Sequence, residues 1–440
     1  MTSRWGRSTL ALFLSVELGL AWLHTPRPAL ADSSLGGATC TYANLKAALA
    51  AGGAVTFNAD CTIPFAQGFN NSPIEVANTA TIDGAGHVVI FDGAAISQLF
   101  TVDNGANLTL RGLTLRNGQA TPEGGANACG GAIDNRGTLT IQKSTLSQNY
   151  ATAAILSTGA GFGGAISNSG KLTIQQSALD DNHVMGGVGG ANGFGGGFGG
   201  AIFSAGAGSV LVISHSTLNG NSASGYIFGG VSPSILGMFD GYGGFGGGFG
   251  GAVYNGVGGR GTVVNSTLDD NQAIGGGIVS SAGGGGNNGK DIGLGAPSCL
   301  YGIGLGGPAG SGGAPGGNGA LGGGGGAPGG KGGFGAGDGS ASASSGPGGG
   351  SGLGGGLFND GATLTVVHSV VSGNTAAGAQ GGAGASSGSG LGGGIYNYSD
   401  GTNAARLILV NNVIADNSQT APSTDVAGDN VPASPRGTAR

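Results

Sequence analysis

The sequence predicts an all-β fold, namely a right-handed parallel β-helix, in which short strands coil around one axis and stack as successive rungs. Three observations support this prediction. A glycine-rich unit recurs six times, an Asn-terminated unit follows each copy, and the large length differences between copies fall at one point of the repeat. Self-similarity of this kind indicates a solenoid, in which insertions gather on one face.

The first unit joins two glycines, a small residue and an aliphatic residue, and five of its six copies end in Asn. Because glycine adopts positive φ without strain, we expect the glycine pair to form a corner that leads into a strand. The copies are GGAIDN at 130–135, GGAISN at 163–168, GGAIFS at 199–204, GGAVYN at 250–255, GGGLFN at 354–359 and GGGIYN at 392–397.

The second unit starts with Ser or Asn, continues as a short strand and closes with Asn. An alternating stretch such as LTIQ at 139–142 separates the two units, so we expect three β stretches in each rung. The copies are STLSQN at 144–149, SALDDN at 177–182, STLNGN at 216–221, STLDDN at 266–271, SVVSGN at 369–374 and NVIADN at 412–417.

The lengths show where insertions are tolerated. From the first glycine to the closing Asn, the copies advance by 19, 19, 22, 21, 20 and 25 residues. The segments that join one copy to the next hold 13, 16, 28, 82 and 17 residues. The inserts of variable length therefore leave the helix at a single corner.

Stacked rungs place equivalent residues above one another, so three internal ladders are expected. Two are aliphatic, and each buried aliphatic side chain stabilises the fold by roughly 1.5–3 kcal/mol. The third is made of closing asparagines whose amides bond along the stack. The ladders are Ile133, Ile166, Ile202, Val253, Leu357 and Ile395; Leu146, Leu179, Leu218, Leu268, Val371 and Ile414; and Asn149, Asn182, Asn221, Asn271, Asn374 and Asn417.

The octet FGGGFGGA occurs at both 194–201 and 245–252. Its final Gly-Gly-Ala is expected to enter the first strand, while FGGG belongs to the insert, with Phe194 and Phe245 over equivalent patches of their rungs. Residues Gly195–Gly200 also match G-x-G-x-x-G. A dinucleotide-binding loop must open a helix, and no helical pattern follows here, so the sequence argues against a phosphate site.

Residues 1–31 read as a secretory signal peptide: Arg4 and Arg7, an apolar run over 10–23, and Ala-Leu-Ala at 29–31. A membrane anchor is the alternative, although the run is shorter than the roughly 20 residues that a spanning helix needs. Cleavage removes three Arg and one Glu, which moves the formal net charge from −6 to −8. An acidic chain with few charges argues against nucleic acid as a partner.

The rest of the chain divides where the composition changes. We expect a cap and first rungs over 32–129, repeats over 130–271, a long glycine-rich insert over 272–353, last repeats over 354–417 and a disordered tail over 418–440. The cap contains a helix over 42–51 with Thr41 as N-cap and Gly52-Gly53 as its end. Short strands are expected near 54–57, 73–76, 80–83, 87–91, 99–102 and 108–118.

Two features of the insert and the cysteines leave alternatives open. Glycine occupies every third position from Gly304 to Gly325, which fits either a flexible linker or extended glycine helices packed against the β-helix. Four cysteines in an exported chain favour disulfides, of which Cys40–Cys61 is the preferred pair, followed by Cys129–Cys299. The alternative is that one pair stays reduced and buried.

Two pairs of acids invite a catalytic interpretation, because glycoside hydrolysis uses two carboxyl groups at a set separation. Asp180-Asp181 and Asp269-Asp270 occupy the same repeat position, where other copies carry SQ, NG, SG and AD. Solvent-facing corner residues explain that pattern more simply. The lysines, at 46, 143, 171, 290 and 331, are scattered along the chain and form no lyase-like cluster with Asp and Arg.

The histidines and one glycine-rich stretch complete the candidates. His215 and His368 share one repeat position, which indicates an outward-facing row, whereas His87 and His183 are solitary. GGFGAGDGS at 332–340 is similar to a calcium-binding nonapeptide, but it occurs once. The sequence therefore predicts no catalytic set, no metal site and no cofactor.

The repeat resembles the polymorphic outer membrane protein repeats of chlamydial surface proteins, and the wider group of bacterial parallel β-helix proteins with a pectin-lyase-like fold. CTYANLKAAL, ATIDGAGHVVIFDG and LTLRGLTLRNG are similar to the opening of exported members of that group. The signal peptide, the regular scaffold with loops on one edge and the absence of a catalytic set predict a monomeric, secreted or cell-surface protein, associated with the outer membrane, with a binding or structural role in contact with polysaccharide, host cells or matrix. The alternatives are an enzyme acting on acidic polysaccharide and a passive envelope or spore-coat filler.

Overall fold

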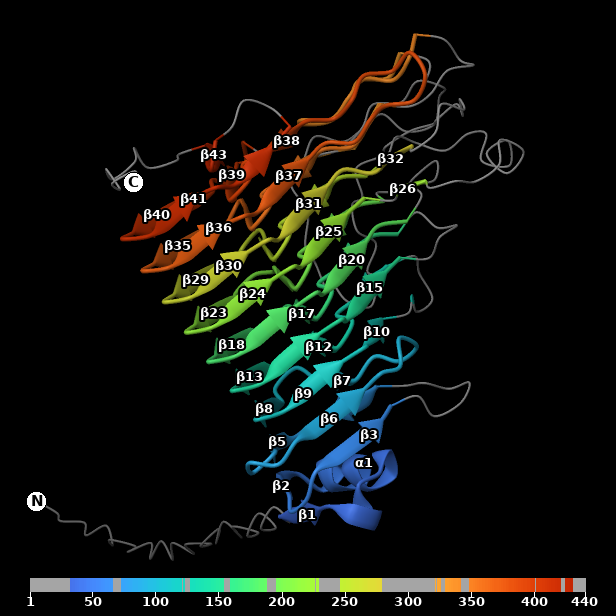
Figure 1. Ribbon diagram of the computed structural model, residues 1–440, viewed down its shortest axis with the longest axis vertical. Helices are drawn as coiled ribbons and strands as arrows, with labels where there is room; N and C mark the ends of the chain where they lie inside the picture. The colour runs from blue at the N-terminus through green and yellow to red at the C-terminus, as the bar shows by residue number, and fades with distance from the viewer. Residues whose placement is uncertain are drawn as a thin grey trace, which may run out of the picture.

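The structure is a computed structural model of the chain, and it forms one elongated solenoid (Figure 1). The rungs follow one another along the long axis, from the helix α1 near the N-terminus to strand β43 near the C-terminus. The residues it describes are 32–65, 73–120, 122, 127–153, 159–187, 195–225, 227–228, 246–278, 321, 323–325, 329–341, 348–399, 401–420 and 424–429.

Five long sheets and one short one are parallel throughout, because every strand pairs with the equivalent strand one rung away. For example, Leu139 pairs with Leu172 and Ile141 with Ile174. The predicted parallel β-helix is therefore confirmed. Sheet A, along the left side of Figure 1, consists of β1 (Ser33–Leu35), β2 (Gly53–Phe57), β5 (Thr79–Asp83), β8 (Asn107–Arg111), β13 (Thr138–Gln142), β18 (Lys171–Gln175), β23 (Val210–Ser214), β29 (Arg260–Val264), β35 (Thr363–Val367) and β40 (Arg406–Val410).

Sheets B and C complete the walls of the main core. Sheet B consists of β3 (Cys61–Pro64), β6 (Val89–Asp92), β9 (Thr114–Arg116), β14 (Thr145–Ser147), β19 (Ala178–Asp180), β24 (Thr217–Asn219), β30 (Thr267–Asp269), β36 (Val370–Ser372) and β41 (Val413–Ala415). Sheet C consists of β4 (Ile74–Val76), β7 (Phe100–Val102), β12 (Ile133–Asn135), β17 (Ile166–Asn168), β22 (Ile202–Ser204), β28 (Val253–Asn255), β34 (Leu357–Asp360), β39 (Ile395–Tyr398) and β43 (Val426–Gly428).

A complete rung holds five strands rather than the three expected, because the chain stays extended after the closing Asn and before the glycine corner. Sheet D consists of β10 (Gln119–Ala120), β15 (Tyr150–Thr152), β20 (His183–Met185), β25 (Ser222–Ser224), β31 (Gln272–Ile274), β37 (Thr375–Ala377) and β42 (Ser418–Gln419). Sheet E consists of β11 (Ala128–Cys129), β16 (Gly161–Phe162), β21 (Gly197–Phe198), β27 (Gly248–Phe249), β33 (Gly352–Leu353) and β38 (Gly390–Leu391), and a sixth sheet pairs β26 (Ile227–Phe228) with β32 (Gly277–Ile278).

Both aliphatic ladders are confirmed. The six residues from Ile133 to Ile395 pair in register through sheet C, and each is 0% exposed. The six from Leu146 to Ile414 pair likewise through sheet B, where the first five are buried and Ile414, on the last rung, is partly buried. Sheets A, B and C therefore enclose one continuous core.

The asparagine ladder is confirmed as well. Each of the first five closing asparagines donates its side-chain amide to Oδ1 of the Asn one rung further on, at 2.8 to 2.9 Å. The same amide also donates to a backbone carbonyl of the preceding rung, as from Asn182 to Leu146 at 3.0 Å. These bonds satisfy amides that are buried and otherwise costly.

The repeated octet has the expected glycine corner. Gly199 and Gly250 have φ of 70° and 64°, and a Cβ on Gly199 would lie 2.0 Å from the Ile202 carbonyl oxygen. Only glycine fits such an approach of backbone to backbone. The second Phe of the octet, Phe198 or Phe249, belongs to a strand of sheet E. Phe194 and Phe245 lie outside the described residues.

Aromatic side chains form a second core, which the sequence analysis did not predict. Because side chains alternate along a strand, the middle residues of the sheet C strands face away from the main core. Phe203, Tyr254 and Phe358 are nevertheless buried, with ring centroids 5.1 and 5.3 Å apart along the stack. Phe198 and Phe249 of sheet E stack beside them at 4.8 Å. The outer face of sheet C is therefore covered.

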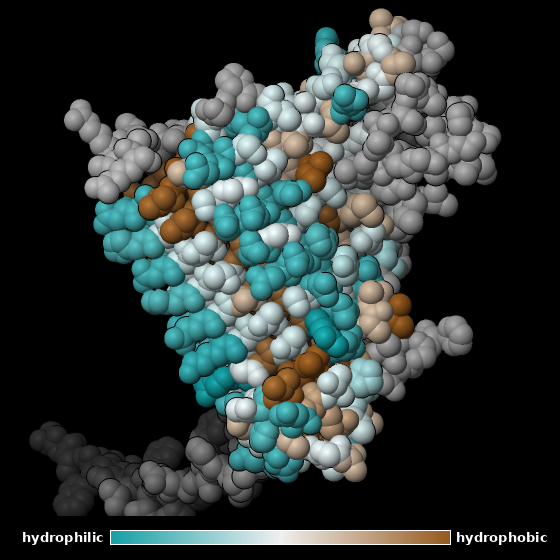
Figure 2. All heavy atoms as spheres, viewed as in Figure 1, coloured by the Kyte–Doolittle hydropathy of each residue, from teal (hydrophilic) through white to brown (hydrophobic). Residues whose placement is uncertain are grey.

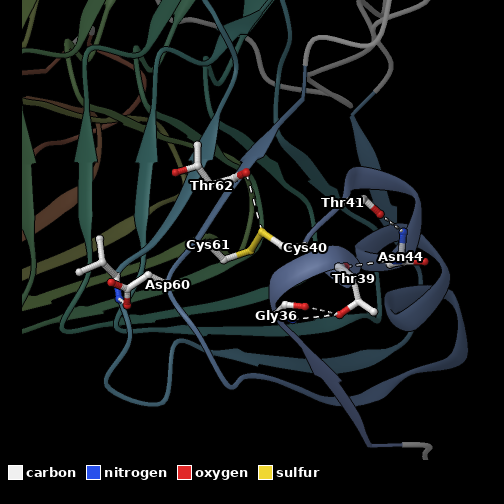
Figure 3. The surroundings of a disulfide bond; sticks show 9 residues. Gly36, Thr39, Cys40, Thr41, Asn44, Asp60, Cys61 and Thr62 are labelled. Carbon is white, nitrogen blue, oxygen red and sulfur yellow. Dashed lines mark hydrogen bonds between the residues drawn. A yellow bond between two sulfur atoms is a disulfide. The ribbon is translucent and has the colours of Figure 1, made fainter.

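The N-terminal end is closed by the short helix η1 (Gly37–Thr39) and by α1 (Tyr42–Ala51), which begins and ends as predicted. The Thr41 side chain accepts a hydrogen bond from the Asn44 backbone N–H at 3.3 Å. A disulfide joins Cys40 to Cys61 on β3, as expected (Figure 3). Cys129 also takes part in a disulfide, and its expected partner, Cys299, lies outside the described residues.

The described glycine segments of the long insert pack against one another, whereas most of the period-three stretch from Gly304 to Gly325 lies outside the described residues. The Gly325 N–H donates to the Gly337 carbonyl at 2.9 Å, and the Gly337 N–H donates to that of Gly349 at 2.9 Å. A Cβ on Gly337 would lie 1.9 Å from the Ser386 carbonyl oxygen, so these segments pack backbone against backbone. The remaining residues of 272–353 lie outside the described part.

The tail differs from the expected disorder at two places, because β42 and β43 pair with β37 and β39. The tail pairs here because the backbone N–H groups of the last rung would otherwise have no acceptor from a further rung. The Asp425 carbonyl accepts hydrogen bonds from the N–H groups of Gly394 and Ile395 at 3.0 and 2.9 Å. Residues 430–440 lie outside the described part.

Candidate functional site

The two acid pairs lie on one outer row of the solenoid. Asp180 ends β19 and pairs with Asn219, which pairs in turn with Asp269 at the end of β30. Asp180 and Asp269 are therefore two rungs apart, which corresponds to about 9.6 Å at the usual strand spacing. Asp181 and Asp270 follow at the next corner, where their φ angles are 51° and 52°.

Glycines on the next rung make room for the corner carboxylates. A Cβ on Gly220 would lie 2.5 Å from Oδ1 of Asp181, and one on Gly373 would lie 2.6 Å from Oδ1 of Asp270. At this corner, an acid and a glycine therefore alternate from Asp181 to Asp416 along successive rungs. The Ser372 hydroxyl donates to Oδ1 of Asp269 at 2.7 Å, so this carboxylate is held from the following rung.

An aromatic pair lies beside the first acid pair. The rings of Tyr150 and His183 stack with centroids 5.4 Å apart on the outer face of sheet D. Burial raises the pKa of the Asp180 carboxyl, and the charge of Asp181 raises it further. Burial lowers the pKa of His183, while Asp181 acts in the opposite direction. Sequence reasoning missed Tyr150, although it directly follows a closing Asn, as His183 does.

This arrangement permits limited chemistry. A half-buried carboxyl with a raised pKa is suited to hold a proton for general acid catalysis. The backbones of Asp180 and Asp269 lie about 9.6 Å apart at the usual strand spacing, compared with the roughly 6.5–9.5 Å found between the carboxyl groups of inverting glycosidases. Within the residues that the structure describes, no group of three or more His, Cys, Asp or Glu side chains is placed to hold a metal ion.

The two related histidines form the outward row that the repeat indicated. His215 and His368 have φ angles of 50° and 48° at the corner between sheets A and B. Nε2 of His215 lies 3.2 Å from the Asn265 side-chain amide, and Nε2 of His368 lies 3.1 Å from that of Asn411. Figure 2 shows hydrophilic side chains in rows along the long axis. His87 lies 3.5 Å from Asp60 in an exposed pair.

Both glycine-rich motifs take part in the structure of the solenoid or its insert, through hydrogen bonds in one case and a strand and corner in the other. In the nonapeptide-like stretch, the Asp338 carboxylate receives hydrogen bonds from Lys331 at 2.7 Å and from the Gly332 backbone N–H at 2.8 Å. The Lys331 bond is the main reason that the pKa of Asp338 is lowered. The G-x-G-x-x-G match at Gly195–Gly200 contains β21 and a corner, and a strand of sheet C follows it.

Comparisons with known proteins do not identify the chain. No protein-family model matches it, and neither the curated proteins nor the solved structures contain a match. In the described part of the chain, no helix is long and apolar enough to span a membrane.

Proposed function

We propose that this protein is an exported, surface-exposed or secreted β-helix with a binding or structural role, in adhesion or matrix contact. We further propose that its repeats are related to those of the polymorphic outer membrane proteins, which they resemble in sequence. It is a scaffold that acts without catalysis, and residues 1–31 direct its export.

One observation carries the proposal: the interior is regular while the exterior is variable. The aliphatic and asparagine ladders continue through all six repeats, whereas the segments joining sheet D to sheet E range from 7 residues, at 121–127, to 77 residues, at 275–351. Length variation confined to one edge of a rigid scaffold is how solenoid proteins vary a binding face.

The experiment is a binding assay with the purified chain 32–440 on cultured host cells, matrix proteins and a glycan panel. We expect saturable binding to at least one of these surfaces, which the heat-unfolded chain does not show. Uniform absence of binding would argue against the proposal. Fractionation of the producing cells tests the location, and retention in the cytoplasm would contradict export.

A carbohydrate-active enzyme is the second candidate, and the row of Asp180 and Asp269 favours it. The test is release of products from pectin, alginate or related polymers. If the protein is such an enzyme, Asp180→Ala or Asp269→Ala abolishes release, as does Asp181→Ala or Asp270→Ala at the adjoining corners. Asp416→Ala is the control, because it removes the acid at the equivalent corner of the last rung, where the preceding residue is Ala415. Absence of product release removes this candidate.

A further inference from the structure

The unpaired positive charges of the described residues lie on or beside one sheet. Of the nine Lys and Arg residues that the structure describes, five have a partner. These pairs are Arg111 with Asp83, Arg116 with Asp92, Arg136 with Asp134, Lys331 with Asp338, and Lys46 over the Tyr42 ring. In the part of the chain that the structure describes, no ion pair is found for Lys171, Arg260 or Arg406 on sheet A, or for Lys143 at its corner.

Three of these cations form a regular row, although the basic residues are scattered in the sequence. Lys171 pairs with Val210, which pairs with Arg260, so the two cations are two rungs apart. Arg260 and Arg406 are likewise two rungs apart. At the usual strand spacing, the positive charges recur about every 9.6 Å along the axis. All three side chains are exposed.

Hydroxyl groups follow the same axis beside the cations. Thr173 and Thr262 lie two residues after Lys171 and Arg260, and their side chains emerge on the same face. Each hydroxyl both donates and accepts hydrogen bonds. The row of half-buried threonines is Thr81, Thr109, Thr140, Thr173, Thr262 and Thr365, with Val212 between the fourth and the fifth.

The negative charges lie mainly elsewhere. Among the outward-facing positions of the sheet A strands, Asp83 carries the one carboxylate, and it pairs with Arg111 at 3.5 Å. The corner acids Asp181 and Asp270 lie on the far side of sheet B. At physiological salt, charges act over about 8 Å, so a ligand on sheet A meets mainly the cations. A chain with net charge −6 therefore presents a locally basic face.

We propose that the outer face of sheet A binds an extended acidic polysaccharide lying along the solenoid axis. Its carboxylate or sulfate groups meet Lys171, Arg260 and Arg406, and its hydroxyl groups bond to the threonine row. The spacing of the cations is on the scale of a disaccharide. This inference names a partner for the proposed binding function and rests on it.

Nucleic acid fits this face less well. Phosphates recur about every 3.4 Å along one strand, so most of them would find no cation in a row spaced about three times more widely. Single-stranded nucleic acid also relies on aromatic side chains on which its bases stack. The outward-facing positions of the sheet A strands carry no aromatic residue.

The experiment measures binding of the chain 32–440 to polygalacturonate and to heparin, with neutral dextran and a single-stranded oligonucleotide as comparison probes. We expect saturable, salt-sensitive binding to at least one acidic glycan and none to dextran. The variant Lys171→Gln/Arg260→Gln is expected to bind about tenfold more weakly, a loss of about 1.4 kcal/mol. Lys171→Arg/Arg260→Lys keeps the charges and retains binding.

The matched control is Lys46→Gln/Lys331→Gln, which removes the same charge from other exposed sites and leaves glycan binding within about twofold of the unmodified chain. Equal losses in the test and control variants would overturn the inference, as would failure to bind either acidic glycan. Oligonucleotide binding as tight as glycan binding would overturn the assignment to glycans. Binding of host cells or matrix proteins without any acidic glycan binding would leave the proposed function in place.

Discussion

Asp425 ends the ladder of asparagines by taking the place of a further asparagine. Its Oδ1 accepts hydrogen bonds from the Asn417 side-chain amide at 2.9 Å and from the Asn417 backbone N–H at 3.1 Å. One rung earlier, Asn374 makes the same two bonds to Oδ1 of Asn417, at 2.9 and 3.0 Å. A carboxylate in the tail therefore completes the last rung.

Asp425→Ala removes the acceptor of both bonds and leaves the Asn417 backbone N–H open, while the Asn417 side-chain amide keeps its bonds to the Val371 and Ala415 carbonyls. Because an unsatisfied buried donor costs about 1–3 kcal/mol, we expect the free energy of unfolding to fall by that amount. Asp425→Asn keeps an acceptor oxygen and stays near the unmodified value. Urea unfolding followed by circular dichroism checks this. Equal stability of the Ala and Asn variants would show that the carboxylate does not terminate the ladder.

Ser204 interrupts a second asparagine ladder, in sheet C. The Asn168 amide donates to the Ser204 hydroxyl oxygen at 2.9 Å, but Oδ1 of Asn255 on the following rung is buried without a hydrogen-bond partner. Ser204→Asn supplies a donor to that oxygen, so we expect a gain of about 1 kcal/mol in unfolding free energy. Ser204→Ala, which removes the acceptor, loses a similar amount. A destabilised Ser204→Asn variant in the same urea assay would contradict the ladder geometry.

The corner glycines require both a positive φ and space. Gly199→Ala places a Cβ 2.0 Å from the Ile202 carbonyl oxygen, whereas Gly105, with φ of 86°, has no atom within 4 Å of such a Cβ. Gly105→Ala therefore tests positive φ alone and is expected to cost about 1–2 kcal/mol. Gly199→Ala adds a backbone clash, so its loss is at least about 3 kcal/mol. Thermal melts compare the two variants, and equal losses would refute the close approach.

Asp180 predicts a dependence of stability on pH. Its pKa is raised in the folded protein, so the folded state holds its proton more firmly than the unfolded state does. Its effect on stability is absent below the unfolded pKa, near 3.8, and becomes unfavourable as pH rises through the folded pKa. We expect Asp180→Asn to be more stable at pH 7, by less than about 1 kcal/mol because the group is half-exposed, and to lose this advantage at pH 3.

Asn219 occupies the equivalent position on the next rung, so the substitution places a residue that the repeat already carries. Unfolding measured between pH 3 and pH 8 checks the prediction. An advantage of Asp180→Asn that is the same at both ends of that range would show that charge is not its cause.

The main core was predictable because Ile133 and Leu146 belong to motifs that recur at a nearly constant spacing. The aromatic core was harder to predict, because it forms between the outer face of sheet C and the strands of sheet E, which lie outside the three-strand pattern. Tyr254 follows Val253 in an alternating strand, and alternation alone predicts that it faces solvent. The signal that was available is Gly-Phe before the glycine corner, at Phe162, Phe198 and Phe249.

The surface rows were less predictable than the core. Lys171 and Arg260 are far apart in sequence because inserts of different lengths separate their rungs, and their alignment depends on the strand register. Asp425 gave no sequence signal, because it ends a ladder once and belongs to no repeat. Periodicity therefore predicted what every rung shares, and it missed what single rungs add.

The most direct test of the stacked rungs is a distance between spin labels measured by pulsed electron resonance. Thr109→Cys and Thr365→Cys lie five rungs apart on sheet A, and Thr109→Cys and Thr262→Cys lie four apart. The predicted label separations are about 24 and about 19 Å, each with a narrow distribution. Broad distributions, or separations that do not differ by about one strand spacing, would contradict the parallel β-helix.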